Sequence, residues 1–125
     1  MKKALISIIA ILLNLSSCAS VQVNGEARVR LMKIGSIEKE CRELEGKRVV
    51  IKAKYMGWRC PEECRNPGIT RSDTCFVDDS GCIYAYGLAG LDPITDRGKE
   101  YIVEVEVLRK GDTCYLRVLK RNEVR

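Results

Sequence analysis

The sequence contains no histidine. This absence excludes Ser-His-Asp and Cys-His nucleophile systems and every metal site that uses a histidine ligand. A glycine-rich phosphate-binding loop is also missing. The apolar run Ala4–Leu13 is too short for a permanent membrane-spanning helix, which needs roughly 20 residues. We therefore expect a non-catalytic protein without a cofactor.

The acidic residues give no clear metal site either. Asp73 and the segment Asp78-Asp79-Ser80-Gly81 offer oxygen atoms of the kind that calcium or magnesium binds. However, Asp-Asp-Ser-Gly is ordinary turn chemistry, because these residues readily form tight turns. We expect this segment to be a turn and not a metal site.

The N-terminus has the three parts of a secretory signal peptide. Met1–Lys3 is positively charged, Ala4–Leu13 is apolar, and Asn14–Ser17 is small and polar. The segment Leu15-Ser16-Ser17-Cys18 resembles a bacterial lipobox, which ends in the cysteine that receives the lipid. The alternative is an ordinary secretory signal in which Cys18 is one more thiol.

The lipobox resemblance implies cleavage before Cys18, a diacylglycerol thioether on its sulfur and an acyl chain such as palmitate on the new N-terminus. Such a protein is anchored in the cell membrane and faces away from the cytoplasm. Ala19 follows the cysteine, which favours the outer membrane if the organism has one. The implied partner is therefore the membrane, through the lipid anchor.

Removal of residues 1–17 leaves 108 of the 125 residues, which is the size of one domain. We interpret residues 18–35 as a tether and residues 36–125 as the folded domain. The alternative for part of the tether is a short strand that starts at Val29 and Leu31. Arg28, Arg30 and Lys33 in the tether either rest on anionic head groups or are simply solvated. The mature chain has 20 basic and 17 acidic residues, since Lys2 and Lys3 leave with the signal. This balance is too even to indicate nucleic-acid binding.

Seven cysteines are present, and lipid on Cys18 would leave an even number. An even set in a small exported domain indicates disulfides, whose pairing the sequence does not determine. The candidates are Cys41, Cys60, Cys64, Cys75, Cys82 and Cys114. Two alternatives remain: a structural zinc held by the middle four, or a redox thiol pair formed by Cys60 and Cys64.

Alternating apolar residues predict a mainly β domain preceded by one short helix. The helix spans Ser36–Glu45, with Ser36 as its N-cap and Gly46 as a left-handed C-terminal residue. The loop Arg59–Ser72 is long and carries Cys60 and Cys64. The predicted strands are Lys47–Trp58, the two arms of a hairpin within Asp73–Gly87, Lys99–Leu108 and Thr113–Arg121. The turn of the hairpin at Asp78–Gly81 is either a two-residue loop or a type I turn with a bulge, and these options differ by one residue in register.

This order resembles a small OB-fold barrel, on the strength of Gly46–Ile51 opening the first strand, Asp78–Ile83 at the hairpin and the final Val/Glu strand. The resemblance implies a closed five-stranded barrel whose first and fourth strands are neighbours. Lys52 and Lys54 would then face Glu104 and Glu106. The helix usual between the third and fourth strands is missing, because Leu88–Gly98 contains glycine and proline. The alternative is an open β-sandwich, or a sheet with one packed helix.

Aromatic and basic residues gather near the long loop and the hairpin. In OB-folds the face of strands two and three binds oligonucleotides or oligosaccharides. The candidate ligand-binding residues are Trp58, Arg59, Arg65, Arg71, Tyr84 and Tyr86. The alternative is that Trp58 packs over the barrel end and the tyrosines fill a sheet face.

These observations lead to three hypotheses about function. The first is a membrane-anchored binding or assembly module of the cell envelope, with an envelope protein or a glycan as partner and nucleic acid not expected. The second is a purely structural surface lipoprotein held together by disulfides. The third is a thiol redox protein that uses Cys60 and Cys64.

Overall fold

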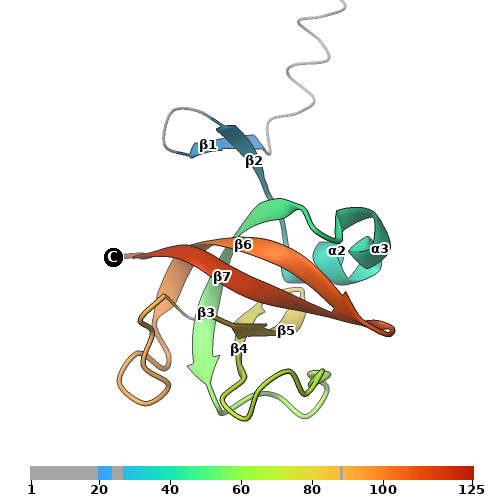
Figure 1. Ribbon diagram of the computed structural model, residues 1–125. Helices are drawn as coiled ribbons and strands as arrows, with labels where there is room; N and C mark the ends of the chain where they lie inside the picture. The colour runs from blue at the N-terminus through green and yellow to red at the C-terminus, as the bar shows by residue number, and fades with distance from the viewer. Residues whose placement is uncertain (1–19, 24–26, 88) are drawn as a thin grey trace, which may run out of the picture.

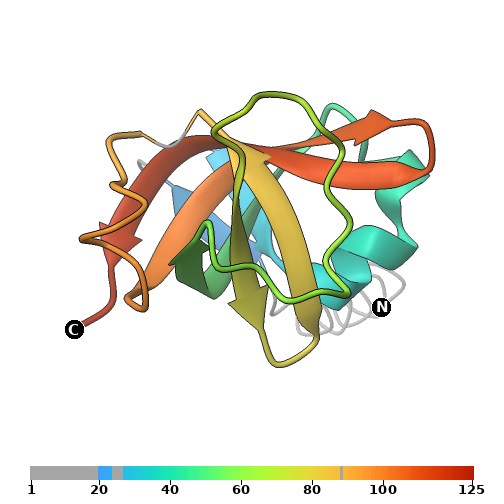
Figure 2. The same ribbon diagram turned by 90° about the horizontal axis from the view of Figure 1, so that it is seen from below.

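The computed structural model describes residues 20–23, 27–87 and 89–125, and its strands form one continuous sheet that closes on itself. The strand order is β1-β2-β3-β4-β5-β7-β6, and β3 also pairs with β6. Figures 1 and 2 show the barrel from two sides. The elements are β1 Ser20–Val23, β2 Ala27–Leu31, α2 Ile34–Lys39, α3 Cys41–Leu44, β3 Arg48–Gly57, β4 Thr74–Asp78, β5 Gly81–Tyr86, β6 Glu100–Lys110 and β7 Thr113–Glu123.

The barrel consists of β3 to β7, and its topology confirms the predicted five-stranded barrel. β3 pairs antiparallel with β4 and β6, whereas β5 and β7 run parallel, with Ala85 opposite Leu116. Closure pairs both edges of every barrel strand for part of its length, which limits aggregation through free edges. The predicted neighbourhood of the first and fourth strands is therefore confirmed.

The barrel core is built from the alternating faces of the strands, as predicted. The inward residues of β3 and β6 are all at most 2% exposed, and each large one stabilises the fold by about 1.5–3 kcal/mol on burial. They are Val49, Ile51, Ala53 and Tyr55 of β3, and Tyr101, Val103, Val105 and Val107 of β6. This strict alternation explains why the strands could be predicted from the sequence.

The predicted register between β3 and β6 is wrong by several residues. Lys54 lies opposite Glu100, and Lys52 lies opposite Ile102. Glu106 instead receives hydrogen bonds from the guanidinium of Arg117 on β7, and Glu104 is buried. Register is set by which inward residues meet in the core, and surface charges have little influence on it.

The helical segment begins earlier than predicted and is divided into two short helices. α2 starts at Ile34, and α3 follows it after Glu40. Ser36 is not the N-cap. The Asp78 carboxylate accepts a hydrogen bond from Ile34 N–H (2.9 Å), and Ser80 Oγ accepts one from Gly35 N–H (2.8 Å). The helix N-terminus is thus capped by the β4–β5 turn, which is distant in sequence and invisible to a local pattern.

The folded domain includes part of the segment interpreted as a tether. β2 pairs in parallel with β3, and Met32 N–H donates to the Val50 carbonyl (2.8 Å). Val29, Met32 and Ile34 are buried. The signal peptide and Cys18 lie outside the described residues. Among the described residues, no helix is long and apolar enough to cross a membrane.

Candidate functional site

The register of the β4–β5 hairpin determines on which face of the sheet its cysteines lie. Asp78 pairs with Gly81 and Val77 with Cys82, so the connection is the two-residue loop of the two predicted alternatives. Cys75 is opposite Tyr84 in the same register. Because side chains alternate along a strand, Cys75, Val77, Cys82 and Tyr84 share one face of the hairpin.

The prediction of a disulfide set is confirmed, with all six candidate cysteines paired. Cys60 bonds to Cys75 and Cys64 to Cys82, which ties the long loop to the hairpin. The third disulfide joins Cys41 of α3 to Cys114 of β7. These bonds use the thiolates that a zinc site would need, and Cys60 and Cys64 belong to different bridges.

The long loop forms a second small core over the hairpin. Cys64, Cys75 and Cys82 are buried there, with Met56, Val77 and Tyr84 packed beside them. Figure 2 shows the loop running across β4 and β5. Asp73 strengthens the end of the loop, since its buried carboxylate accepts hydrogen bonds from Ile69 N–H (2.8 Å) and Thr70 N–H (3.0 Å). The loop is therefore a fixed cover and not an open binding arm.

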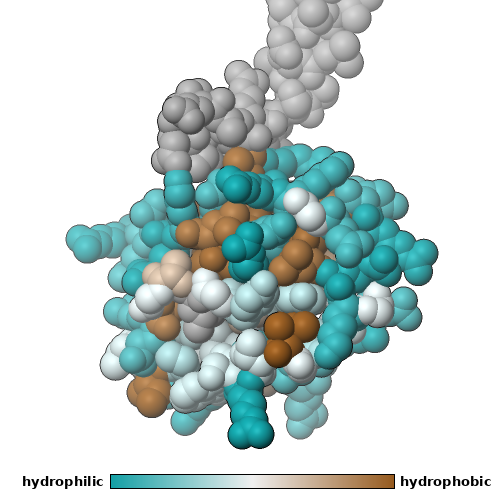
Figure 3. Space-filling view, viewed as in Figure 1, coloured by the Kyte–Doolittle hydropathy of each residue, from teal (hydrophilic) through white to brown (hydrophobic). Residues whose placement is uncertain are grey.

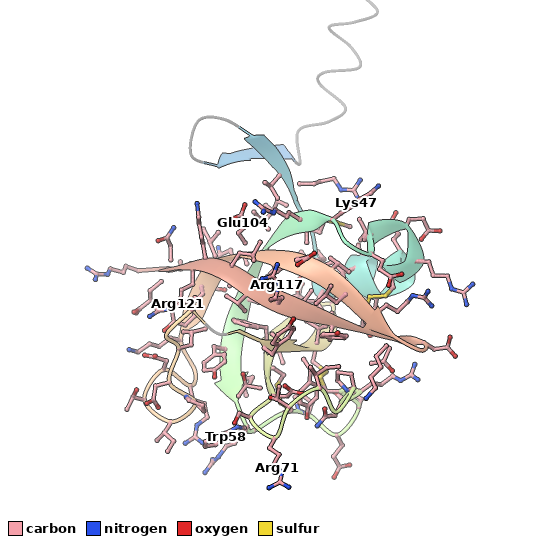
Figure 4. All side chains as sticks on the ribbon, viewed as in Figure 1. Lys47, Trp58, Arg71, Glu104, Arg117 and Arg121 are labelled. Atoms are coloured by element: carbon pink, nitrogen blue, oxygen red, sulfur yellow. A yellow bond between two sulfur atoms is a disulfide. The ribbon has the colours of Figure 1, made fainter. Side chains whose placement is uncertain are left out.

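The predicted aromatic and basic residues do not form one continuous surface. Tyr84 belongs to the second core, and Tyr86 packs against Tyr115 with ring centres 5.9 Å apart. Trp58 is 54% exposed. In Figure 4, Trp58 and Arg71 lie at the end of the barrel opposite Lys47 and Glu104.

Arg65 lies away from that end, at a hollow of about 80 Å³ shared with Glu38, Asp112 and Thr113. Burial raises the pKa of Glu38, and the nearby Arg65 guanidinium opposes this shift. Arg59 is exposed at the start of the long loop. Arg59, Arg65 and Arg71 are therefore all residues of the loop that covers the hairpin.

A recess in the described part of the chain lies elsewhere, and sequence reasoning missed it. It has a volume of about 640 Å³ and is bounded by residues 31–33 before α2, 52–54 of β3, 77–79 at the end of β4, and Glu100. Lys33 Nζ lies 2.8 Å from Asp79 Oδ1 at its border. This ion pair raises the pKa of Lys33 and lowers that of Asp79. The sequence analysis named Lys52 and Lys54, but only as partners of glutamates on a neighbouring strand. The recess itself exists because β2 packs beside β3.

Four large apolar side chains of the described residues are notably exposed. Leu31 (41%) lines the recess, and Ile102 (44%) is opposite Lys52 in the sheet. Ile94 and Trp58 are the other two. Figure 3 shows apolar patches lying between hydrophilic side chains on the face that carries β6 and β7.

The sequence matches no protein-family model and no curated protein. Solved structures do match. An OB domain of a Methanosarcina mazei protein is 20% identical, with a TM-score of 0.51, over 75% of this chain and 83% of that chain. The Stn1–Ten1 complex of S. pombe matches at 9% identity and a TM-score of 0.50, over 80% of each chain. The telomere capping protein Ten1 from Saccharomyces pombe matches at 9% identity and a TM-score of 0.46, over 76% of this chain and 80% of that chain.

The chain has an OB-fold. Its β4 and β5 correspond to strands two and three of that fold, whose face commonly binds oligonucleotides or oligosaccharides. In this OB-fold the corresponding face is covered by the loop between Trp58 and Asp73, held by two disulfides. The domain therefore departs from other OB-folds at the position where they usually bind ligands.

The prediction about partners is wrong. We expected the membrane through a lipid anchor, with an envelope protein or a glycan as further partner and no nucleic acid. The lipid anchor depends on residues 1–18, which lie outside the described residues, so the correction concerns the partner of the folded domain. The matched structures include the Stn1–Ten1 complex of S. pombe, and the comparisons give no support for a membrane or glycan partner. The expectation of no nucleic-acid binding rested on the charge balance of the chain and on its expected compartment. Both are indirect evidence about the partners of an OB-fold, so nucleic acid is no longer excluded.

Proposed function

We propose that this chain is an exported lipoprotein whose OB-fold domain has a structural, non-catalytic role. One observation carries the proposal: three disulfides use all six cysteines between residues 41 and 114. Disulfides of this kind form and persist in oxidising compartments outside the cytoplasm. The signal-like segment Met1–Ser17 supports the same compartment.

The lipobox-like segment supports the anchor. Six of the seven cysteines are paired with one another, so Cys18 is the cysteine left for another role. Thioether attachment of diacylglycerol to Cys18, followed by acylation of its amino group, gives enough apolar chain for firm membrane attachment. This processing places the domain outside the cytoplasm, on the membrane surface.

The covered face supports a structural role over ligand capture at the usual OB position. Two disulfides and the second core would have to open before a ligand could reach the hairpin face around Cys75, Cys82 and Tyr84. A redox role for Cys60 and Cys64 is also disfavoured, because each is bonded to a hairpin cysteine and not to the other.

The proposal is tested by expressing the full chain in a bacterium in the presence of a labelled fatty acid. We expect the wild-type protein to carry the label and to sediment with membranes. The Cys18→Ser variant is expected to lose the label, because no other cysteine is available for the thioether. The paired variant Cys41→Ser, Cys114→Ser is the control and should remain labelled. An unlabelled wild-type protein, or label that persists in Cys18→Ser, would contradict the anchor.

A further inference from the structure

The recess beside β3 contains a short stretch of unpaired strand edge. β2 pairs with β3 up to Val50, and β4 begins to pair with it at Lys54. Since Val50 directs its carbonyl toward β2, alternation directs the N–H and C=O of Lys52 toward the same edge. No described residue forms a backbone hydrogen bond with Lys52 on this edge. The edge therefore presents one donor and one acceptor inside a recess of about 640 Å³.

The charged side chains around this edge differ in whether they have a partner. Asp79 pairs with Lys33, and Asp78 accepts hydrogen bonds from the N–H groups of Ile34 (2.9 Å) and Ser80 (2.8 Å). Among the described residues, Lys52 and Lys54 form no ion pair within 4.0 Å.

Glu100 is the remaining carboxylate that lines the recess, and it lies opposite Lys54 in the sheet. Its negative charge offsets part of the positive charge of Lys54. The ammonium group of Lys52 therefore has less negative charge near it than that of Lys54. The recess therefore favours a ligand with one negative charge close to Lys52.

The same recess has an apolar wall. Leu31, Met32 and Val77 line it beside the strand edge, and 41% of Leu31 is exposed. A ligand that fits must therefore combine an anionic group with an apolar one. It must also supply an acceptor for the Lys52 N–H and a donor for the Lys52 carbonyl.

We propose that this recess binds the free carboxyl end of a peptide whose last residue is apolar. The terminal carboxylate accepts from the Lys52 N–H and faces the ammonium groups of Lys52 and Lys54. The amide N–H of the last residue donates to the Lys52 carbonyl, and its side chain packs on Leu31 and Val77. Carboxyl-terminal capture by backbone groups is a known way of recognising peptides.

The geometry favours a chain end over a strand that runs through. β2 and β4 occupy the same edge of β3 on either side of Lys52, so a continuous added strand would collide with one or the other. An apolar acid without an amide, such as a fatty acid, leaves the Lys52 carbonyl without a donor. This inference goes beyond the proposed structural role, which requires no ligand.

The test uses the full chain with intact disulfides, purified in detergent and labelled with ¹⁵N-lysine. The probe is acetyl-Gly-Ala-Val with a free carboxylate, and the Lys52 amide signal is followed by NMR. We expect a saturable shift of that signal and slower hydrogen exchange of its amide. Amidation of the peptide carboxylate, or N-methylation of its last amide, should weaken binding at least tenfold.

Variants separate this site from general attraction of anions. Lys52→Gln and Lys54→Gln should each weaken binding at least fivefold, measured by anisotropy of a fluorescent form of the peptide. Lys47→Gln is the matched control, because Lys47 does not line the recess, and it should bind like the wild type. Thermal unfolding of each variant confirms that it is folded.

Three results would overturn the proposal: no saturable shift at millimolar peptide, equal binding of hexanoate, or equal loss in Lys47→Gln. None of them affects the fatty-acid labelling of Cys18, so failure here is distinguishable from failure of the proposed lipoprotein.

Discussion

At the scale of single residues, Gly57 is the described glycine at which an added Cβ would be most crowded. It ends β3 with φ of +59°, and a Cβ added there would clash with the carbonyl oxygen of Pro93. The sequence placed this glycine inside the predicted strand Lys47–Trp58. It could not predict the contact with Pro93, because the two residues are separated by a loop and a hairpin.

Gly57→Ala is expected to be strongly destabilising. A non-glycine residue at this φ costs about 1–3 kcal/mol, and the clash with rigid backbone adds about 1–3 kcal/mol. Gly111→Ala is the matched control, since Gly111 has φ of +60° but nothing within 4 Å of an added Cβ. Urea unfolding of the disulfide-intact proteins measures both. Equal losses in the two variants would show that the contact with Pro93 has no energetic effect.

At the scale of elements, the disulfides divide into two kinds. Cys41–Cys114 joins α3 to β7 across a separation of 73 residues, whereas the two loop disulfides close separations of 15 and 18 residues. The number of cysteines predicted a disulfide set. The pairing depended on the hairpin register, which the sequence left open between two alternatives.

Removal of the long-range disulfide is expected to cost more stability than removal of either loop disulfide. Loop-closure entropy gives about 4.4 kcal/mol for Cys41–Cys114 and about 3 kcal/mol for each of the others. Paired serine variants compared by urea unfolding measure this difference.

The loop variants should show a second effect that the long-range variant lacks. Trypsin should cleave Cys60→Ser, Cys75→Ser near Arg65 or Arg71 faster than the wild type, because only one of the two disulfides that fix the loop over the hairpin remains. Unchanged cleavage would contradict the view that these bonds hold the cover in place.

At the scale of the whole molecule, the sequence predicted the fold much better than the site. The alternation of apolar and polar residues in β3 and β6 predicted these barrel strands. The residues that point into the barrel are the ones expected from that alternation. The recess beside Lys52 was missed because it requires β2, a strand that sequence analysis placed in a tether. The partners were predicted wrongly because a fold such as this one supports many functions and identifies none.

The most direct test of the account is the intact mass of the full protein extracted from membranes, alkylated before and after reduction. We predict a chain that begins at Cys18 and carries diacylglycerol and an N-terminal acyl group. No alkyl group should be added before reduction, and six should be added after it, two for each of three disulfides. A chain that begins at Met1 without lipid, or thiols that react before reduction, would contradict the account of an exported, disulfide-stabilised lipoprotein.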